Sequence, residues 1–95
     1  MITSKQRAML RKLANSMDPI FQIGKYGVEE NLLNQISDAL EARELIKIKV
    51  LETSGITSRE ASEILCEELN CEGVQVIGNK LVIYRKSTKK PKIEL

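Results

Sequence analysis

Hydrophobic side chains recur with helical spacing near the start of the chain. They fall three or four residues apart and form one apolar stripe, made by Met9, Leu10, Leu13, Ala14 and Met17. Thr3 precedes the stripe and Gln6 stands three residues further on, which is a capping-box pattern and predicts the start of a helix. Asp18-Pro19 predicts its end, because proline disfavours helical backbone in the residue before it.

Two further helical patterns alternate with strand patterns. Residues 19–23 form a short apolar run that predicts a strand, and a helix is expected from about Val28 to Ala42. Residues 45–51 alternate apolar and polar side chains, which predicts a strand with Lys47 and Lys49 on one face. A third helix is expected to start near Thr57, where Glu60 completes a second capping box.

The last pattern is a hairpin. Residues 74–77 and 81–84 are strand-like runs, and Gly78-Asn79 between them suits a two-residue turn. The expected order is therefore α-β-α-β-α-β-β. Strand–helix–strand units favour parallel pairing and the hairpin favours antiparallel pairing, so we expect a mixed four-stranded sheet packed by helices. The chain is predicted to be a compact single α/β domain over residues 1–86, followed by a basic, poorly ordered tail over 87–95.

Composition fits one small globular domain of 95 residues, with 42% hydrophobic and 29% charged residues. We expect it in the cytoplasm and away from membranes, because the sequence has no long apolar run and no signal-peptide pattern. Cys66 and Cys71 are expected to be buried or half-buried structural thiols rather than a disulfide or a zinc site.

The net charge of +2 conceals a segregation along the chain. Residues 28–72 hold four basic and eleven acidic residues, a net charge of −7, whereas residues 1–27 carry +4 and residues 73–95 carry +5. If the fold brings the two basic ends together, one face suits a polyanion. For the acidic middle, ordinary solvated surface is the favoured explanation.

Residues 24–27 read Gly-Lys-Tyr-Gly, between the first strand and the second helix. Glycines let a loop backbone approach a ligand closely, and loops of this kind clamp the sugar-phosphate backbone of single-stranded RNA. Lys25 adds a charge for phosphate, and Tyr26 adds a face for base stacking. A tight turn without function is the simpler alternative. Glu29 and Glu30 follow at once, so we expect a phosphate over the loop rather than on the helix axis.

Catalysis has little support in the sequence. Histidine, the commonest general base, is absent, and no serine, cysteine or lysine stands in a known nucleophile motif. We therefore expect a protein that is not an enzyme and holds no cofactor and no metal.

Three separated motifs then resemble one known family. They are residues 19–28, residues 39–47 and residues 74–85, and the opening Lys5-Gln6-Arg7 with Leu10-Arg11 fits as well. Together they resemble the CRM domain (chloroplast RNA splicing and ribosome maturation), in the size of the stand-alone bacterial YhbY family. That resemblance implies an RNA-binding domain similar in topology to the C-terminal domain of translation initiation factor three. It also implies association with precursors of the large ribosomal subunit and no cofactor.

The family's Gly-x-x-Gly loop maps onto residues 24–27. The residues predicted to contact RNA are Gly24, Lys25, Tyr26, Gly27, Lys5, Arg7, Arg11, Lys12, Lys47, Lys49, Lys80, Arg85 and Lys86. We expect a monomer that binds ribosomal RNA and not DNA. The alternative function is a protein-interaction adaptor that holds a basic ribosomal protein or assembly factor through its acidic helices.

Overall fold

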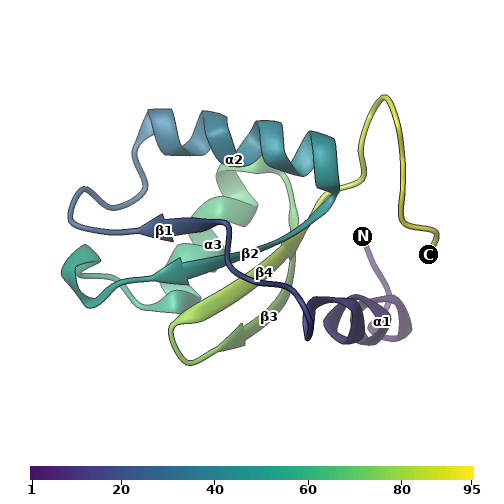
Figure 1. Ribbon diagram of the computed structural model, residues 1–95, viewed down its shortest axis with the longest axis horizontal. Helices are drawn as coiled ribbons and strands as arrows, with labels where there is room; N and C mark the ends of the chain where they lie inside the picture. Colours follow the sequence, from purple (N-terminus) through teal and green to yellow (C-terminus); the bar gives the residue numbers. More distant parts are fainter.

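The computed structural model describes residues 1–95 and contains the predicted elements in the predicted order (Figure 1). They are α1 (Ser4–Ala14), β1 (Phe21–Ile23), α2 (Glu30–Arg43), β2 (Leu45–Val50), α3 (Ser58–Leu69), β3 (Glu72–Ile77) and β4 (Lys80–Tyr84), with a 3₁₀ turn at Glu52–Ser54.

The four strands form one mixed sheet in the order β1-β2-β4-β3. Strands β1 and β2 pair in parallel and are joined through α2, whereas β4 pairs antiparallel with both β2 and β3. The predicted mixed sheet is confirmed. The closing hairpin places β4 in the interior of the sheet rather than at its edge.

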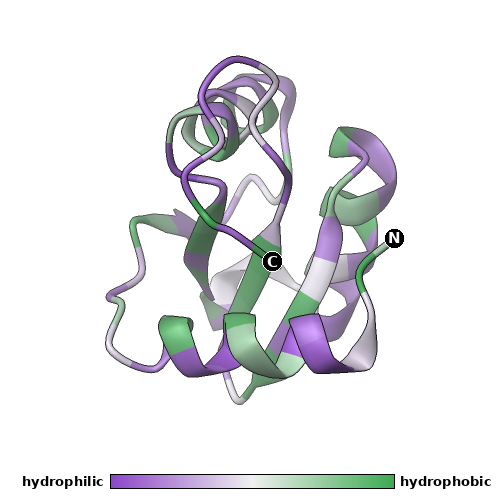
Figure 2. Ribbon diagram, turned by 90° about the vertical axis from the view of Figure 1, so that its right-hand side faces the viewer, coloured by the Kyte–Doolittle hydropathy of each residue, from purple (hydrophilic) through white to green (hydrophobic).

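The helices cover the two faces of the sheet unequally (Figures 1 and 2). α2 and α3 pack on one face around the larger buried cluster, which includes Ile23, Leu40, Ile48 and Leu65. α1 covers only one end of the other face, where Leu10 and Ala14 meet Leu45, Val74, Val82 and Tyr84. The remaining end of that face is left without a helix.

Both predicted capping boxes are present. The Gln6 backbone N–H donates to the Thr3 hydroxyl at 3.1 Å, and the Glu60 N–H donates to Thr57 at 3.0 Å. α1 nevertheless ends at Ala14, before the proline that was predicted to stop it. Its apolar stripe is only partly buried, because the side chains of Met9 and Leu13 are 40% and 45% exposed.

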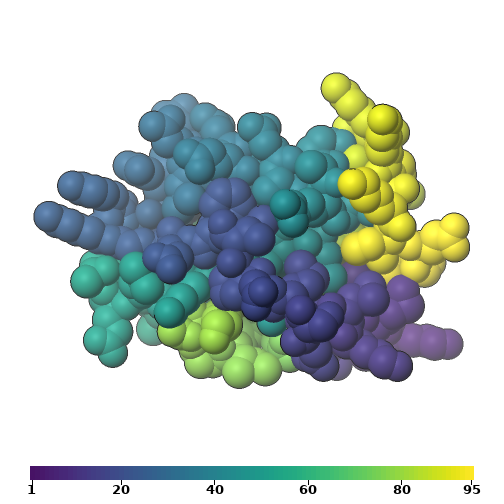
Figure 3. All heavy atoms as spheres, in the orientation of Figure 1, coloured from purple at the N-terminus to yellow at the C-terminus, as the bar shows by residue number.

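The C-terminal segment differs from the poorly ordered tail that the sequence predicted. Residues 87–93 fold back against the C-terminal end of α2 and donate hydrogen bonds to Glu41 of this helix and to Glu44, the residue that follows it. Figure 3 shows this segment (yellow) at the opposite end of the molecule from the loop that follows β1.

Candidate RNA-binding surface

The loop between β1 and α2 is a tight turn with an open outer side. The Gly27 N–H donates to the Gly24 carbonyl at 2.8 Å, which closes the turn. Gly27 has φ +65°, a left-handed conformation that favours glycine, and a Cβ there would meet no atom within 4 Å. The loop backbone is therefore accessible to a ligand on the side where Gly27 has no side chain.

Lys25 and Tyr26 project from this loop as a pair. The Tyr26 ring is 76% exposed, and the Lys25 ammonium lies 5.7 Å from its centroid. This geometry permits a cation–π contact, which holds a charge for phosphate beside a face for stacking. An aromatic ring so exposed in a chain with three aromatics contributes little to the core, so it is available to a partner.

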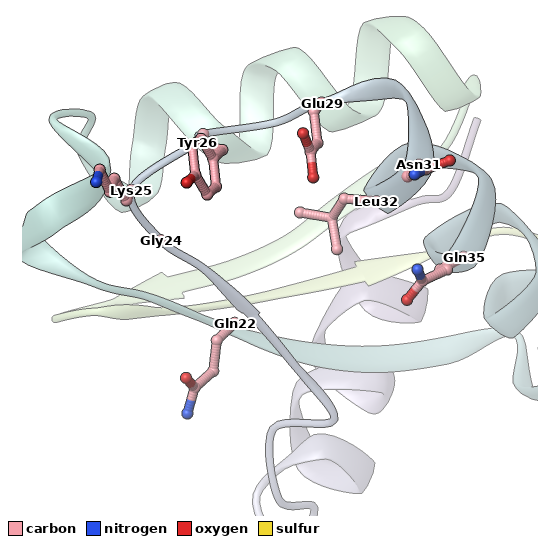
Figure 4. A pocket seen from close by; sticks show the side chains of 9 residues that line it. Gln22, Gly24, Lys25, Tyr26, Glu29, Asn31, Leu32 and Gln35 are labelled. Carbon is pink, nitrogen blue, oxygen red and sulfur yellow. The ribbon is translucent and has the colours of Figure 1, made fainter.

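A cavity of about 270 Å³ lies between the loop and the first turns of α2 (Figure 4). Its two apolar lining residues are Tyr26 and Leu32. The other side chains that line it are polar or charged: Gln22, Lys25, Glu29, Asn31 and Gln35. Figure 4 shows that Tyr26 and Glu29 hang from the same side of the loop. The cavity offers hydrogen-bonding groups more than positive charge.

Glu29 stands before α2 rather than within it. The helix begins at Glu30, two residues later than the predicted start at Val28, because Glu29 has extended backbone angles (φ −96°, ψ 167°). Glu29 is the N-cap residue, yet its side chain makes no capping hydrogen bond. Its carboxylate is therefore uncommitted, unlike the side chains of Thr3 and Thr57 in the two capping boxes.

The uncovered end of the sheet face next to the loop carries lysines. Lys49 of β2 is in register with Gln22 of β1 on one side and with Lys80 of β4 on the other. Lys47 lies two residues back and points to the same face as Lys49. Like charges directly opposite each other in a sheet are unfavourable, and a bound polyanion would relieve their repulsion. We call Lys47, Lys49 and Lys80 the sheet-face lysines.

The basic residues of α1 lie at the other end of this face. α1 packs beside Leu45 and Tyr84, away from the loop. Lys5 and Lys12 are exposed, and Arg11 is half-buried. Arg7 is committed to the fold, because its Nε donates to the Gly73 carbonyl at 3.0 Å and ties α1 to β3. The sheet-face lysines thus lie between the loop and α1.

Arg85 and Lys86 follow β4 and line a cavity beside the N-terminal turn of α1. The Arg85 guanidinium donates to the Leu69 carbonyl at 3.1 Å and to the Ser37 carbonyl at 2.9 Å, so it links α3 to α2. It also reaches the Ser37 hydroxyl at 3.1 Å. Lys86 is exposed at the start of the C-terminal segment. The structure gives Arg85 a structural task that its charge alone did not indicate.

Two glutamates hold the C-terminal segment, and sequence reasoning missed both. Glu44 is completely buried and accepts backbone N–H groups from Ser87, Lys92 and Ile93 at 2.6–2.8 Å. Burial alone raises the pKa of Glu44, but these three N–H groups outweigh it, so the pKa lies below its usual value of 4.5. Glu44 has φ +67°, a conformation that residues with a side chain rarely adopt.

Glu41 holds the same segment from its outer side. It accepts hydrogen bonds from the Ser87 hydroxyl, from Thr88 and from the Lys89 N–H. The bond from Ser87, with those from Thr88 and Lys89, lowers the pKa of Glu41 from 4.5 to about 2. We call Glu41 and Glu44 with residues 87–93 the tail clamp. The clue in the sequence was the Ser-Thr pair in the tail, which can donate to a carboxylate.

The two cysteines meet at the C-terminal end of α3. Asn70 adopts a left-handed conformation, and the Cys71 N–H donates to the Cys66 carbonyl at 3.2 Å, which is the bonding of a Schellman motif. That motif brings the two side chains into contact. The Cys71 thiol donates to the Leu65 carbonyl at 3.5 Å. The adjacent Cys71 thiol lowers the pKa of Cys66 to about 7, whereas the Cys66 sulfur and burial raise the pKa of Cys71. The predicted buried and half-buried free thiols are confirmed.

None of the three α-helices combines the length and the apolar character that a membrane span requires. The structure also brings together no group of three or more acidic or cysteine side chains that could hold a metal ion.

Comparison with known proteins gives consistent matches. The family model described as the CRS1 / YhbY (CRM) domain matches residues 2–85. The probable RNA-binding protein YqeI of Bacillus subtilis (strain 168) is 44% identical over 95 residues, which cover 100% of this chain and 99% of that protein. An RNA-binding protein of Haemophilus influenzae is 35% identical and covers 99% of this chain, with 94% of its own length matched.

A solved structure matches as well. The solution structure of a Staphylococcus aureus protein superposes with a TM-score of 0.79 at 48% sequence identity. The match covers 100% of this chain and 99% of that one. The family resemblance drawn from the three motifs is confirmed.

Proposed function

Because this chain belongs to the CRS1/YhbY (CRM) domain family, we propose that it is a non-enzymatic RNA-binding protein that contacts RNA through residues 24–27 and the sheet-face lysines. The observation that carries the proposal is the pairing of an exposed ring with an ammonium group on an open glycine turn. The relatives named as RNA-binding proteins support RNA as the partner.

In the proposed contact, the loop and the sheet-face lysines act on neighbouring nucleotides. Lys25 pairs with a phosphate beside the loop amides, and the base stacks on Tyr26. The next phosphates run along Lys49, Lys80 and Lys47, which continue from Gln22 across the uncovered end of the sheet. Lys5, Arg11 and Lys12 extend the same face with weaker contacts. Residues 1–86 form the binding domain, and residues 87–95 are a basic tail outside the proposed contact.

The proposed biological target is a precursor of the large ribosomal subunit, bound by one monomer in the cytoplasm. This target is what the resemblance to the stand-alone bacterial family implies. Sedimentation of ribosomal particles from cells tests it directly. We expect the protein to travel with large-subunit precursors, and its recovery only in fractions free of ribosomal particles would rule out the assembly role.

The contact itself is tested with the double variant Lys25→Ala/Tyr26→Ala. Loss of one stacked base and one phosphate contact should weaken the binding of ribosomal RNA fragments by roughly tenfold or more. Lys90→Ala is the matched control, because it removes one exposed charge from the tail clamp, at the far end of the molecule. Unchanged affinity in the double variant would refute a loop-centred contact.

The salt dependence of RNA binding measures how many phosphates the protein neutralises. Four neutralised phosphates on a single strand predict a slope of log affinity against log salt of roughly −3. Replacing Lys49 by alanine should reduce its magnitude by about 0.7. A slope near zero in the unaltered protein would contradict the electrostatic contact.

The adaptor alternative depends on acidic side chains that are free to bind a basic protein, and two of these side chains are not free. Glu41 and Glu44 are already occupied by the tail clamp, which leaves exposed glutamates of α3 such as Glu63 and Glu67 for a protein partner. Pull-downs with and without RNase separate the two functions. A partner that survives RNA digestion would favour the adaptor.

A further inference from the structure

The cavity beside the loop has the wrong charge for a phosphate and the right groups for a base. Its acidic wall is Glu29, and only one cationic side chain, Lys25, lines it. We propose that this cavity accepts one unpaired guanine base, whose N1–H and N2–H groups donate to the two oxygens of the Glu29 carboxylate. This inference rests on the proposed function, because the base enters as part of an RNA strand.

Stacking comes from the loop itself. The exposed Tyr26 ring and the Glu29 side chain hang from the same side of the loop, and Leu32 of α2 lies beside them (Figure 4). A base stacked on the ring therefore turns its edge toward Glu29. Lys25, 5.7 Å from the ring centroid, is placed to pair with the phosphate of the same or the adjacent nucleotide.

The choice of guanine follows from the chemistry of a carboxylate, which only accepts hydrogen bonds when ionised. Guanine presents two adjacent N–H donors on its Watson–Crick edge. Adenine and cytosine each place an acceptor beside their amino group, and uracil places one N–H between two carbonyl oxygens. Only guanine can therefore fill both carboxylate oxygens without setting an acceptor against the charge. The amide of Gln35, which also lines the cavity, supplies a donor for guanine O6.

The structure leaves Glu29 free for this task. It is the N-cap residue of α2 but makes no capping hydrogen bond. Glu41 and Glu44, at the other end of the same helix, are both fully engaged by hydrogen bonds. Glu30, the neighbour of Glu29, carries the same charge but does not line the cavity. It therefore serves as a control for charge alone.

The test uses short oligouridines that carry a single central guanosine, adenosine, cytidine or inosine, with affinity measured by fluorescence anisotropy. The unaltered protein should prefer guanosine over adenosine by roughly tenfold, the discrimination of one bidentate contact. Inosine, which lacks N2–H, should fall between them. Glu29→Gln should abolish the preference by weakening the binding of the guanosine oligonucleotide, whereas Glu30→Gln should keep the preference. Both variants remove one negative charge, so both should bind the adenosine oligonucleotide slightly more tightly than the unaltered protein does.

Three results would overturn the inference, and they are distinguishable. If every oligonucleotide binds with salt dependence but without base preference, or if Glu29→Gln keeps the preference, the guanine cavity is wrong and the RNA-binding function stands. If no RNA binds, the proposed function fails and the guanine inference fails with it.

Discussion

The two ends of α2 carry similar charges and have opposite structures. At its N-terminal end, Glu29 stands beside a lysine-bearing loop, and its carboxylate makes no capping bond. At its C-terminal end, Glu41 and Glu44 stand beside a lysine-bearing tail, and both carboxylates accept several hydrogen bonds from it. Both ends pair glutamates with lysines in an irregular segment, so their charge patterns look alike in sequence.

The difference shows that the commitment of polar atoms, rather than the number of charges, separates a binding surface from a structural joint. The loop closes with one backbone hydrogen bond and leaves Tyr26 76% exposed. The tail clamp buries Glu44 completely and satisfies its carboxylate within the chain. Changes at the clamp should therefore alter stability, and changes at the loop should alter RNA affinity.

The largest effect on stability is expected from Glu44→Ala. It leaves three backbone N–H groups, those of Ser87, Lys92 and Ile93, without their acceptor. The free energy of unfolding should fall by about 3 kcal/mol, measured by urea denaturation. RNA affinity, measured where the variant is folded, should stay the same. A variant that lost RNA affinity but no stability would contradict the assignment of the tail clamp to stability.

A second variant separates the carboxylate from the backbone. Glu44 has φ +67°, and glycine accepts such a backbone at little cost. Glu44→Gly should therefore be more stable than Glu44→Ala by about 1 kcal/mol, although both lack the carboxylate. Equal stabilities would mean that the backbone conformation costs nothing.

Acid should open the clamp before it affects the loop. The pKa of Glu41 is lowered to about 2 and that of Glu44 is lowered as well, so both glutamates bind protons more readily in the unfolded chain. Their stabilising contribution is complete above about pH 4.5 and is lost as the pH falls toward 2. Amide exchange of residues 87–93 followed by NMR should accelerate over this range. In Glu41→Gln the change should be smaller.

Arg85→Ala tests a residue that the sequence placed among the RNA contacts. The variant removes three hydrogen bonds that join Ser37 of α2 to Leu69 of α3. We expect a loss of about 2 kcal/mol in the free energy of unfolding. RNA affinity at a temperature where the variant is folded should be unchanged. A loss of RNA affinity without a loss of stability would indicate that Arg85 contacts RNA.

The smallest effects are expected at the two loop glycines. Gly27→Ala should cost about 1 kcal/mol of stability, because φ is +65° although the space is open. Gly24→Ala should cost less than about 0.5 kcal/mol, since its Cβ would meet Leu51 Cδ1 at an ordinary 3.5 Å. If RNA approaches the loop backbone, Gly24→Ala should still weaken binding. Equal binding by both variants and the unaltered protein would show that the glycines serve the turn alone.

Local patterns predicted the elements because their signals are local. The capping boxes at Thr3 and Thr57 and the Gly78-Asn79 turn each depend on residues within one turn of chain, and all three lie where they were predicted. The family motifs predicted the loop at residues 24–27 for the same reason. Alternation along β2 placed Lys47 and Lys49 on one face of the sheet. The pairing of β2 with β1 and β4 then showed that this face adjoins the loop.

Long-range commitments could not be predicted in this way. The hydrogen bonds of Arg85 and of Glu44 join residues 16 to 49 positions apart. No local sequence pattern indicates which distant residue is the partner. Met9 and Leu13 belong to the apolar stripe that predicted α1, yet both side chains are exposed. Their exposure follows from how little of α1 the end of the sheet can cover.

The tail clamp also sets an order of events during synthesis. The N–H of Ser87 that binds Glu44 is made 43 residues after it. At roughly 5–20 residues per second, a ribosome adds those residues in about 2 to 9 seconds. Throughout that interval the N–H groups that donate to the Glu44 carboxylate do not yet exist. The carboxylate therefore stays hydrated, and α2 and β2 cannot bury it. The strand that leads into this segment, β4, is also central to the sheet. The domain therefore reaches its final form only when its last strand and the segment beyond it have left the exit tunnel.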